Sequence, residues 1–192
     1  WRATGSLADY LQHHGVLGVS GIDTRQLTRH LRDKGSQNGC LFTGDLLSTT
    51  QAQERAQSFQ GLQNQDLTPD VSIKETAPSL TPTLPLLGLK SATPTDFPPH
   101  ILVIDFGVKS QILRLLVDSG CQVTVCPAHT SSDEILAAKP DGVVLSNGPG
   151  DPFACTQIIK TVQELLSAEL PIFGICLGFQ LLALALGGKT KK

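Results

Sequence analysis

PIFGICLGFQLLALALGG, residues 171–188, carries no charged side chain. An uncharged run of this length is almost long enough for a membrane-spanning helix, and the lysines after it would suit a cytoplasmic flank. Gly174 and Gly178 interrupt the run, which is typical of a buried strand followed by a turn and a buried helix. We therefore expect a strand at 171–175, a helix at 179–186 and no membrane segment.

Three similar strand–helix pairs precede this unit. Short apolar runs suited to buried parallel strands occur at 101–105, 121–126 and 142–146, and helical spacing follows them at 110–120, 131–139 and 155–167. Strands that alternate with helices predict a flavodoxin-like α/β domain, in which a parallel sheet is covered by helices on both faces. Ligands of such sheets bind at the carboxyl ends of the strands.

Two helices are expected near the start of the chain, at 6–14 and 22–35. Asp23 lies three residues before Gln26, which is the spacing of an N-terminal capping box. Apolar side chains of the second helix, Leu27 and Leu31, are expected to face a core. Its basic side chains are expected to be solvated, or else to form a surface for a partner subunit: Arg25, Arg29, Arg32 and Lys34.

Residues 75–99 contain six of the twelve prolines, interleaved with serine and threonine. No apolar periodicity survives there, so we expect a linker or a long irregular connection. The predicted organisation is a first domain within 1–74, this linker, and the α/β domain over 100–192.

The composition of the chain limits the classes of protein to which it can belong. Hydrophobic residues make up 40% of the chain and charged residues 17%, as in a folded domain, and a net charge of -2 shows no footprint for nucleic acid. Five cysteines form no CxxC pair and no signal peptide precedes them, which predicts reduced thiols in a cytoplasmic protein. The chain has no methionine and begins with Trp1, so we expect a piece of a longer protein.

Cys176 lies between the last predicted strand and helix, in Gly-Ile-Cys-Leu-Gly. Glycines two residues before and after a nucleophile permit a strained turn that lifts its side chain out of the sheet. The following helix N-terminus would favour a thiolate, and the Leu177 N–H could stabilise an oxyanion. A structural cysteine is the alternative, and the pattern by itself leaves both open. The remaining cysteines lack this setting and are expected to be packing residues: Cys40, Cys121, Cys126 and Cys155.

A second motif, SNGPGDP at 146–152, leaves the third predicted strand of the series. Two glycines and two prolines make a rigid loop whose backbone N–H groups are available to a ligand. A tight strand-to-helix connection is the alternative. The expected position at the carboxyl edge, beside Cys176, favours a ligand site.

Together, LSNGPGDP and PIFGICLGFQLLALALGGKT resemble the class I glutamine amidotransferases. GIDTRQLTRHLRDKGSQNGC, residues 21–40, resembles the first domain of one branch of that family, the small subunits of carbamoyl-phosphate synthetase. The resemblance covers nearly the whole chain and is weakest at 75–99. It implies a partial amidotransferase domain preceded by part of a smaller α+β domain.

The resemblance also implies a glutaminase activity. Cys176 matches the nucleophile that attacks the side-chain amide of glutamine and forms a thioester, Leu177 matches the oxyanion-hole residue, and Gln180 matches a substrate contact. Gly148 and Gly150 match the loop glycines that hold glutamine. Ammonia would pass to a large subunit that makes carbamoyl phosphate from bicarbonate and ATP, for arginine and pyrimidine synthesis. No cofactor or metal is expected on this chain, since ATP and Mg²⁺ would bind to the large subunit.

Two departures from the family pattern bear on activity. Phe179 stands where the family motif has histidine, and the family's general-base histidine and its orienting glutamate come from a segment later than Lys192. His129 follows a predicted strand at the correct edge, whereas His100 precedes its strand. A cysteine without a base is only a few per cent thiolate near neutral pH, so little glutaminase activity is expected of the 192-residue chain alone.

Three other interpretations stay open. One is a catalytically inactive module that binds the partner subunit through its first domain. Another is a class I amidotransferase of a different branch, such as anthranilate or guanylate synthesis, against which the 21–40 segment argues. The last is a flavodoxin-like cofactor binder, for which the loops show no phosphate-binding pattern.

Overall fold

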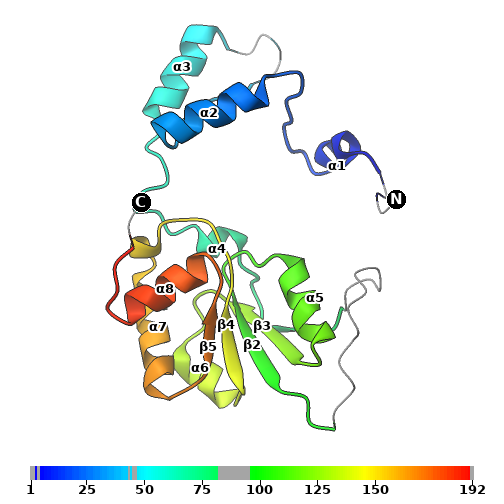
Figure 1. Cartoon of the computed structure of the whole chain (residues 1–192), viewed down its shortest axis with the longest axis vertical. Helices are drawn as coiled ribbons and strands as arrows, with labels where there is room; N and C mark the ends of the chain where they lie inside the picture. Colours follow the sequence, from blue (N-terminus) through cyan, green and yellow to red (C-terminus); the bar gives the residue numbers. More distant parts are fainter. Residues whose placement is uncertain (1–2, 4, 43, 45–46, 82–95, 191–192) are drawn as a thin grey trace. The chain divides into compact units, whose positions relative to one another are not determined.

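The computed structural model describes residues 3, 5–42, 44, 47–81 and 96–190 (Figure 1). The chain divides into two compact units, Trp1–Gly61 and Leu62–Lys192. The second unit contains the sheet and all of the predicted site residues. The described part of the first unit contains helices and no strand.

Five strands form one sheet in the second unit, in the order β1-β3-β2-β4-β5. Their bounds are β1 Ala77–Ser79, β2 His100–Asp105, β3 Gln122–Pro127, β4 Gly142–Leu145 and β5 Ile172–Gly174. The strands from β2 to β5 are parallel, which confirms the predicted α/β sheet. The order of the strands reverses between β2 and β4: the chain passes from β2 outward to β3 and then crosses back to β4 on the other side of β2. Ligands of such sheets bind at this switch point.

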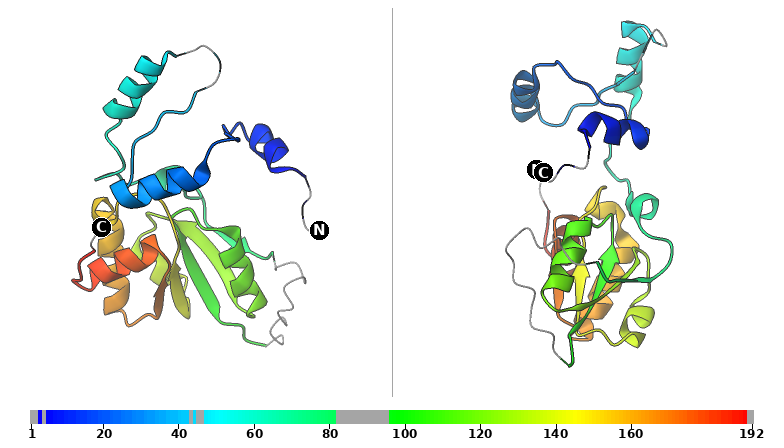
Figure 2. Two further views of the ribbon diagram at one scale, coloured as in Figure 1. Left: turned by 45° about the horizontal axis from the view of Figure 1, so that its top comes forward. Right: turned by 90° about the vertical axis from the view of Figure 1, so that its right-hand side faces the viewer.

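Helices cover both faces of the sheet, as predicted (Figures 1 and 2). Their bounds are α5 Ser110–Asp118, α6 Ser132–Ala137, α7 Thr156–Ser167 and α8 Leu177–Ala185. Buried side chains of α6, α7 and α8 form a single cluster with one face of the sheet: Ile135, Ile158, Val162, Leu165, Leu177 and Leu181 with Leu102, Ile104, Val143 and Leu145. The α5 side chains pack on the opposite face: Leu113, Leu116 and Val117 against Val103, Val123, Val125 and Val144.

Strand β1 is a correction to the sequence prediction. It pairs with β3 in the antiparallel direction at the edge of the sheet, within the segment expected to be an irregular connection. Three residues that include Pro78 show no periodicity, and only pairing with a neighbouring strand makes them a strand. Residues 82–95 of the predicted linker lie outside the described residues.

The first unit contains α1 Leu7–His13, α2 Thr24–Lys34 and α3 Thr49–Ser58. The first two confirm the predicted helices. The α2 helix begins as expected, with the Asp23 carboxylate accepting a hydrogen bond from the Gln26 N–H at 2.9 Å. The α3 helix was not predicted, although Ser48 and Gln51 form a complete capping box at its start.

Leu27 and Leu31 do not face a core, which is a second correction. Their side chains are 46% and 40% exposed, and α1 and α2 bury no residue. Among the described residues of this unit, Ala52 of α3 is the only buried hydrophobic residue. Helical spacing places the leucines on one stripe, but no described element of this unit buries that stripe.

The division between the units also differs from the predicted first domain, which extended to residue 74. Residues up to Gly61 contact mainly one another, and so do the residues from Leu62 onward. The short helix α4, Thr68–Val71, and the chain on either side of it therefore belong with the sheet.

Candidate active site

Cys176 lies at a sharp turn between β5 and α8. Its φ of 53° and ψ of -110° are values that a non-glycine residue rarely adopts, at a cost of roughly 1–3 kcal/mol. Cys176 is the N-cap residue of α8, and its side chain is exposed. The thiol is therefore presented to solvent at a helix N-terminus, which is the geometry of a nucleophile elbow.

Gly174 and Gly178 are required by close packing around this turn. A Cβ on Gly178 would lie 2.2 Å from the Leu145 carbonyl oxygen, and a Cβ on Gly174 would lie 2.7 Å from the backbone of Gly178. The Gly178 N–H also donates to the Ser146 carbonyl oxygen at 3.1 Å. The start of α8 thus abuts the end of β4 and the first residue of the loop that follows it.

Two side chains tie the loop after β4 to the loop after β2. The buried Ser146 hydroxyl accepts from the Phe106 N–H at 2.8 Å and donates to the Asn147 carbonyl oxygen at 2.8 Å. The Asn147 side chain accepts from the Lys109 N–H at 3.1 Å and donates to the Gly107 carbonyl oxygen at 2.9 Å. These bonds hold the two loops together at the point where the strand order reverses.

Gly148 lies between the β2 loop and α8. A Cβ at this position would lie 2.2 Å from the Phe106 carbonyl oxygen and 3.0 Å from Leu177 Cδ2, so a larger residue does not fit. Within the described part of the chain, the N–H groups of Gly148, Gly150 and Leu177 donate to no protein acceptor. The structure therefore brings Gly148 and Leu177 together beside Cys176, with free backbone donors.

Gln180 and Phe179 lie in the first turn of α8. The Gln180 N–H donates to the Cys176 carbonyl oxygen at 3.1 Å, and its side chain is half-buried. Phe179 is 62% exposed. The aromatic ring therefore lies at the surface and is not part of either core cluster of this unit.

The two histidines of this unit lie at opposite edges of the sheet, as predicted. His129 follows β3, and its Nε2 lies 3.5 Å from Asp66 Oδ2. His100 begins β2, and its Nε2 lies 2.9 Å from the Thr124 hydroxyl. Among the described residues, no histidine hydrogen-bonds the Cys176 thiol.

Sequence reasoning missed residues 64–73 as part of the site's surroundings. This segment includes α4 and contacts the last residue of β2 and the loops after β3 and β4. The sequence signal that could have indicated this segment is Asp66-Leu-Thr-Pro, which is typical of a helix start. In the structure the Asp66 carboxylate accepts hydrogen bonds from the Thr68 N–H at 2.9 Å and from the Thr68 hydroxyl at 2.7 Å.

Other cysteines have a different environment from Cys176. Burial raises the pKa of Cys126 to about 12, and burial followed by the nearby charge of Asp66 raises the pKa of Cys155 to about 12. Burial also raises the pKa of Cys121, which like Cys40 is partly buried. Among the five thiols, only that of Cys176 is exposed.

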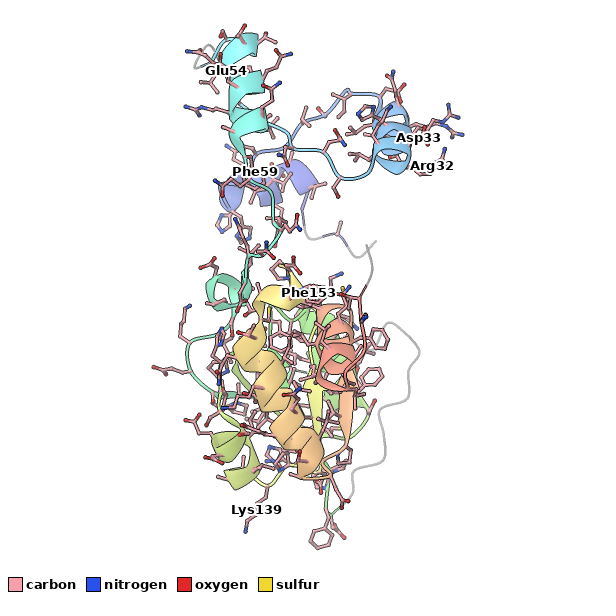
Figure 3. The ribbon with its side chains drawn as sticks, turned by 90° about the vertical axis from the view of Figure 1, so that its left-hand side faces the viewer. Arg32, Asp33, Glu54, Phe59, Lys139 and Phe153 are labelled. Atoms are coloured by element: carbon pink, nitrogen blue, oxygen red, sulfur yellow. The ribbon has the colours of Figure 1, made fainter. Side chains whose placement is uncertain are left out.

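Figure 3 shows the side chains of both units, among them the exposed Phe153 that follows the glycine loop.

Metal sites and membrane spans are both absent from the described residues. No group of three or more histidine, cysteine, aspartate or glutamate side chains there could hold a metal ion. No helix in the described ranges is both long enough and apolar enough to cross a membrane.

Comparison with known proteins finds two family models and several relatives that match this chain. Residues 102–192 match the family model of class-I glutamine amidotransferases, and residues 1–41 match the model of the carbamoyl-phosphate synthase small chain, CPSase domain. The chain is 48% identical over its full length to the carbamoyl phosphate synthase small chain of Photorhabdus laumondii, and 50% identical to that of Pseudomonas syringae. Residues 102–192 are thus similar to the class-I glutamine amidotransferases.

The class-I amidotransferase model covers the sheet from β2 onward, including the elbow and the loop after β4. The chain spans about half the length of the small chains that it matches, 50% in Photorhabdus laumondii and 51% in Pseudomonas syringae. A solved structure from Thermoplasma acidophilum, described as one of the subunits of GMP synthase, matches 48% of this chain and 47% of its own, with 28% identity and a TM-score of 0.42. The two family-model matches confirm the resemblance seen in the sequence motifs.

Proposed function

We propose that this chain carries the nucleophile of a glutaminase that works as the small subunit of a carbamoyl-phosphate synthase. The observation that supports it is the strained, exposed Cys176 at the start of α8, beside the free N–H groups of Gly148 and Leu177. A thiolate at a helix N-terminus is stabilised by the helix dipole and by the unpaired N–H groups of the first turn.

In the proposed reaction, Cys176 Sγ attacks the γ-carboxamide carbon of glutamine. The carbonyl oxygen becomes an oxyanion that accepts hydrogen bonds from the Leu177 N–H and from the glycine N–H groups of the loop after β4. The C–N bond then breaks, the nitrogen leaves as ammonia after gaining a proton, and a glutamyl thioester remains. Water hydrolyses the thioester, releases glutamate and restores the thiol.

The ammonia would be used by a large subunit that consumes ATP and Mg²⁺, in a cytoplasmic complex that serves arginine and pyrimidine synthesis. The match of residues 1–41 to the small-chain model supports this partner. The exposed leucine stripe of α2 also supports it, because a stripe left open within its own unit is suited to contact with another chain or segment.

Turnover requires a base for the thiol and for the attacking water. Since no histidine among the described residues bonds the Cys176 thiol, we expect the 192-residue chain to react as a thiol but to release glutamate very slowly. Rapid glutamate release that is lost in Cys176→Ala would contradict this expectation and would direct the search for a base to this chain.

Protection from alkylation tests the glutamine site itself. The chain is treated with iodoacetamide at pH 8 with and without glutamine, and modification of each cysteine is followed by peptide mass spectrometry. Glutamine should slow the labelling of Cys176 several-fold and leave the half-buried Cys121 unaffected. Equal labelling of Cys176 at all glutamine concentrations would refute the proposed site and would favour a module that only binds its partner.

A further inference from the structure

We propose that residues 64–73, which include α4, are part of the frame of the glutamine site, and that Asp151 is the positioning residue that joins this segment to it. The inference rests on the proposed function, because it concerns how the loop after β4 is held for glutamine. Neither family model covers the segment, since they match residues 1–41 and 102–192.

Asp151 ends the glycine loop and is 6% exposed. Its carboxylate accepts from the Asn64 N–H at 3.0 Å through one oxygen and from the Phe153 N–H at 3.1 Å through the other. Its own N–H donates to the Gln65 carbonyl oxygen at 2.9 Å. One residue therefore connects the 64–73 segment, the glycine loop and the turn that leads into α7.

Gly150 is enclosed by the same segment. Its φ of 106° is a glycine conformation, and a Cβ there would lie 3.0 Å from the Gln65 carbonyl oxygen and 3.1 Å from the Leu67 nitrogen. Since the backbone of residues 65–67 limits where Gly150 can lie, it also limits where the Gly150 N–H points. That N–H is one of the donors offered to glutamine in the proposed function.

The segment is anchored at the other strand ends as well. The buried Asp105 carboxylate, at the end of β2, accepts from the Ile73 N–H at 2.8 Å. After β3, the Ser72 hydroxyl accepts from the Ala128 N–H at 2.9 Å. The 64–73 segment thus bridges the carboxyl ends of β2, β3 and β4, and it is fixed independently of the loop that it supports.

This arrangement makes Asp151 a positioning residue and not a catalytic one. Its carboxylate is occupied by backbone N–H groups and is turned away from solvent, so it holds the loop without contacting the substrate. Removing it would free the glycine loop to adopt several conformations, and glutamine would then have to order the loop on binding. The expected result is weaker glutamine binding, with the reactivity of the Cys176 thiol unchanged.

Asp151→Ala and a matched control distinguish this role from general destabilisation. The control is Asp141→Ala, in which the lost carboxylate accepts from the His100 N–H at 2.7 Å at the opposite edge of the sheet. Asp151→Asn is the milder variant, because an amide keeps one acceptor oxygen and loses the other. Each variant is tested for folding by circular dichroism and then by the iodoacetamide assay.

The readout is the glutamine concentration that halves the rate of Cys176 labelling, compared with the rate without glutamine. Asp151→Ala should raise that concentration at least about tenfold and Asp151→Asn about threefold, while the unprotected rate changes less than about twofold. Asp141→Ala should change neither value. If Asp151→Ala does not fold, Asp151→Asn decides the question.

Two failures are distinguishable. If glutamine does not protect wild-type Cys176, the proposed function fails and the positioning role fails with it. If glutamine protects the wild type and both Asp151 variants at the same concentration, the function stands and the positioning role of Asp151 is refuted. An equal loss of protection in Asp141→Ala would also refute it, because the effect would then be general destabilisation.

Discussion

Replacing Gly178 by alanine tests whether the elbow is held by direct packing of α8 against β4. The added Cβ would lie 2.2 Å from the Leu145 carbonyl oxygen, and ordinary contacts begin at 3.4 Å. The obstacle is the backbone of a buried strand, which cannot turn aside as a side chain can. The start of α8 must therefore withdraw from the sheet by about 1.2 Å, the difference between these distances.

The cost of that withdrawal follows from what α8 buries. Leu177 and Leu181 are 2% and 0% exposed, and burying such side chains contributes about 1.5–3 kcal/mol each. A gap of about 1 Å forfeits a quarter to a half of the contact energy, which is roughly 1–3 kcal/mol for the pair. The withdrawal would also weaken the hydrogen bond from the Gly178 N–H to the Ser146 carbonyl oxygen, which adds about 1 kcal/mol to the loss of stability. We expect Gly178→Ala to lower the free energy of unfolding by about 3 kcal/mol.

Urea denaturation followed by circular dichroism measures this loss, with Gly142→Ala as the control. A Cβ on Gly142 would lie 3.4 Å from the Pro171 carbonyl oxygen, an ordinary contact, so that variant should change the free energy of unfolding by less than about 0.5 kcal/mol. A loss below about 1 kcal/mol for Gly178→Ala, with unchanged glutamine protection of Cys176, would show that the elbow does not depend on this contact.

Three further predictions concern the core and the loops. Ser146→Ala leaves the Phe106 N–H without its acceptor and should lower the free energy of unfolding by about 2 kcal/mol in urea; an unchanged midpoint would contradict the proposed tie between the loops. Because the Cys126 pKa is about 12 when folded and 9.0 without burial, only the unfolded state loses this proton as pH rises from 9 to 12. The wild type should therefore lose up to about 1.4 kcal/mol per pH unit relative to Cys126→Ala over that range, measured as urea stability, and parallel pH profiles would refute it. Leu165→Ala should lower the free energy of unfolding in urea by about 3 kcal/mol, because Leu165 is 0% exposed. Leu27→Ala should lower it by less than about 1 kcal/mol, because Leu27 is 46% exposed. Similar losses in the two variants would contradict the exposure of the α2 leucines.

The alternation of strands and helices over residues 100–186 was predictable because it is a local signal. Buried parallel strands are short apolar runs, and helices show their period within two turns, so each element could be recognised from its own residues. The elbow was predictable for the same reason. Glycines at positions 174 and 178 leave space that the neighbouring backbone occupies, and this requirement is visible within five residues of sequence.

The edge strand β1 and the exposure of the α2 leucines were less predictable. Strand β1 has three residues and no period, and it exists because β3 offers an open edge. The leucine stripe of α2 was predicted to be buried, yet periodicity shows only which residues share a face of the helix. Whether another element packs against that face depends on tertiary contacts.

Local patterns in the sequence therefore predict the α/β architecture, the resemblance to the class I amidotransferases, and a cysteine framed by glycines at a strand–helix turn. The segments that surround that turn are known only from the folded structure. Asn64 and Asp151 are separated by 87 positions, and nothing local to either predicts that they share a hydrogen bond. Folding brings the carboxyl ends of the parallel strands to one edge, where a segment from outside the β–α series can bridge them.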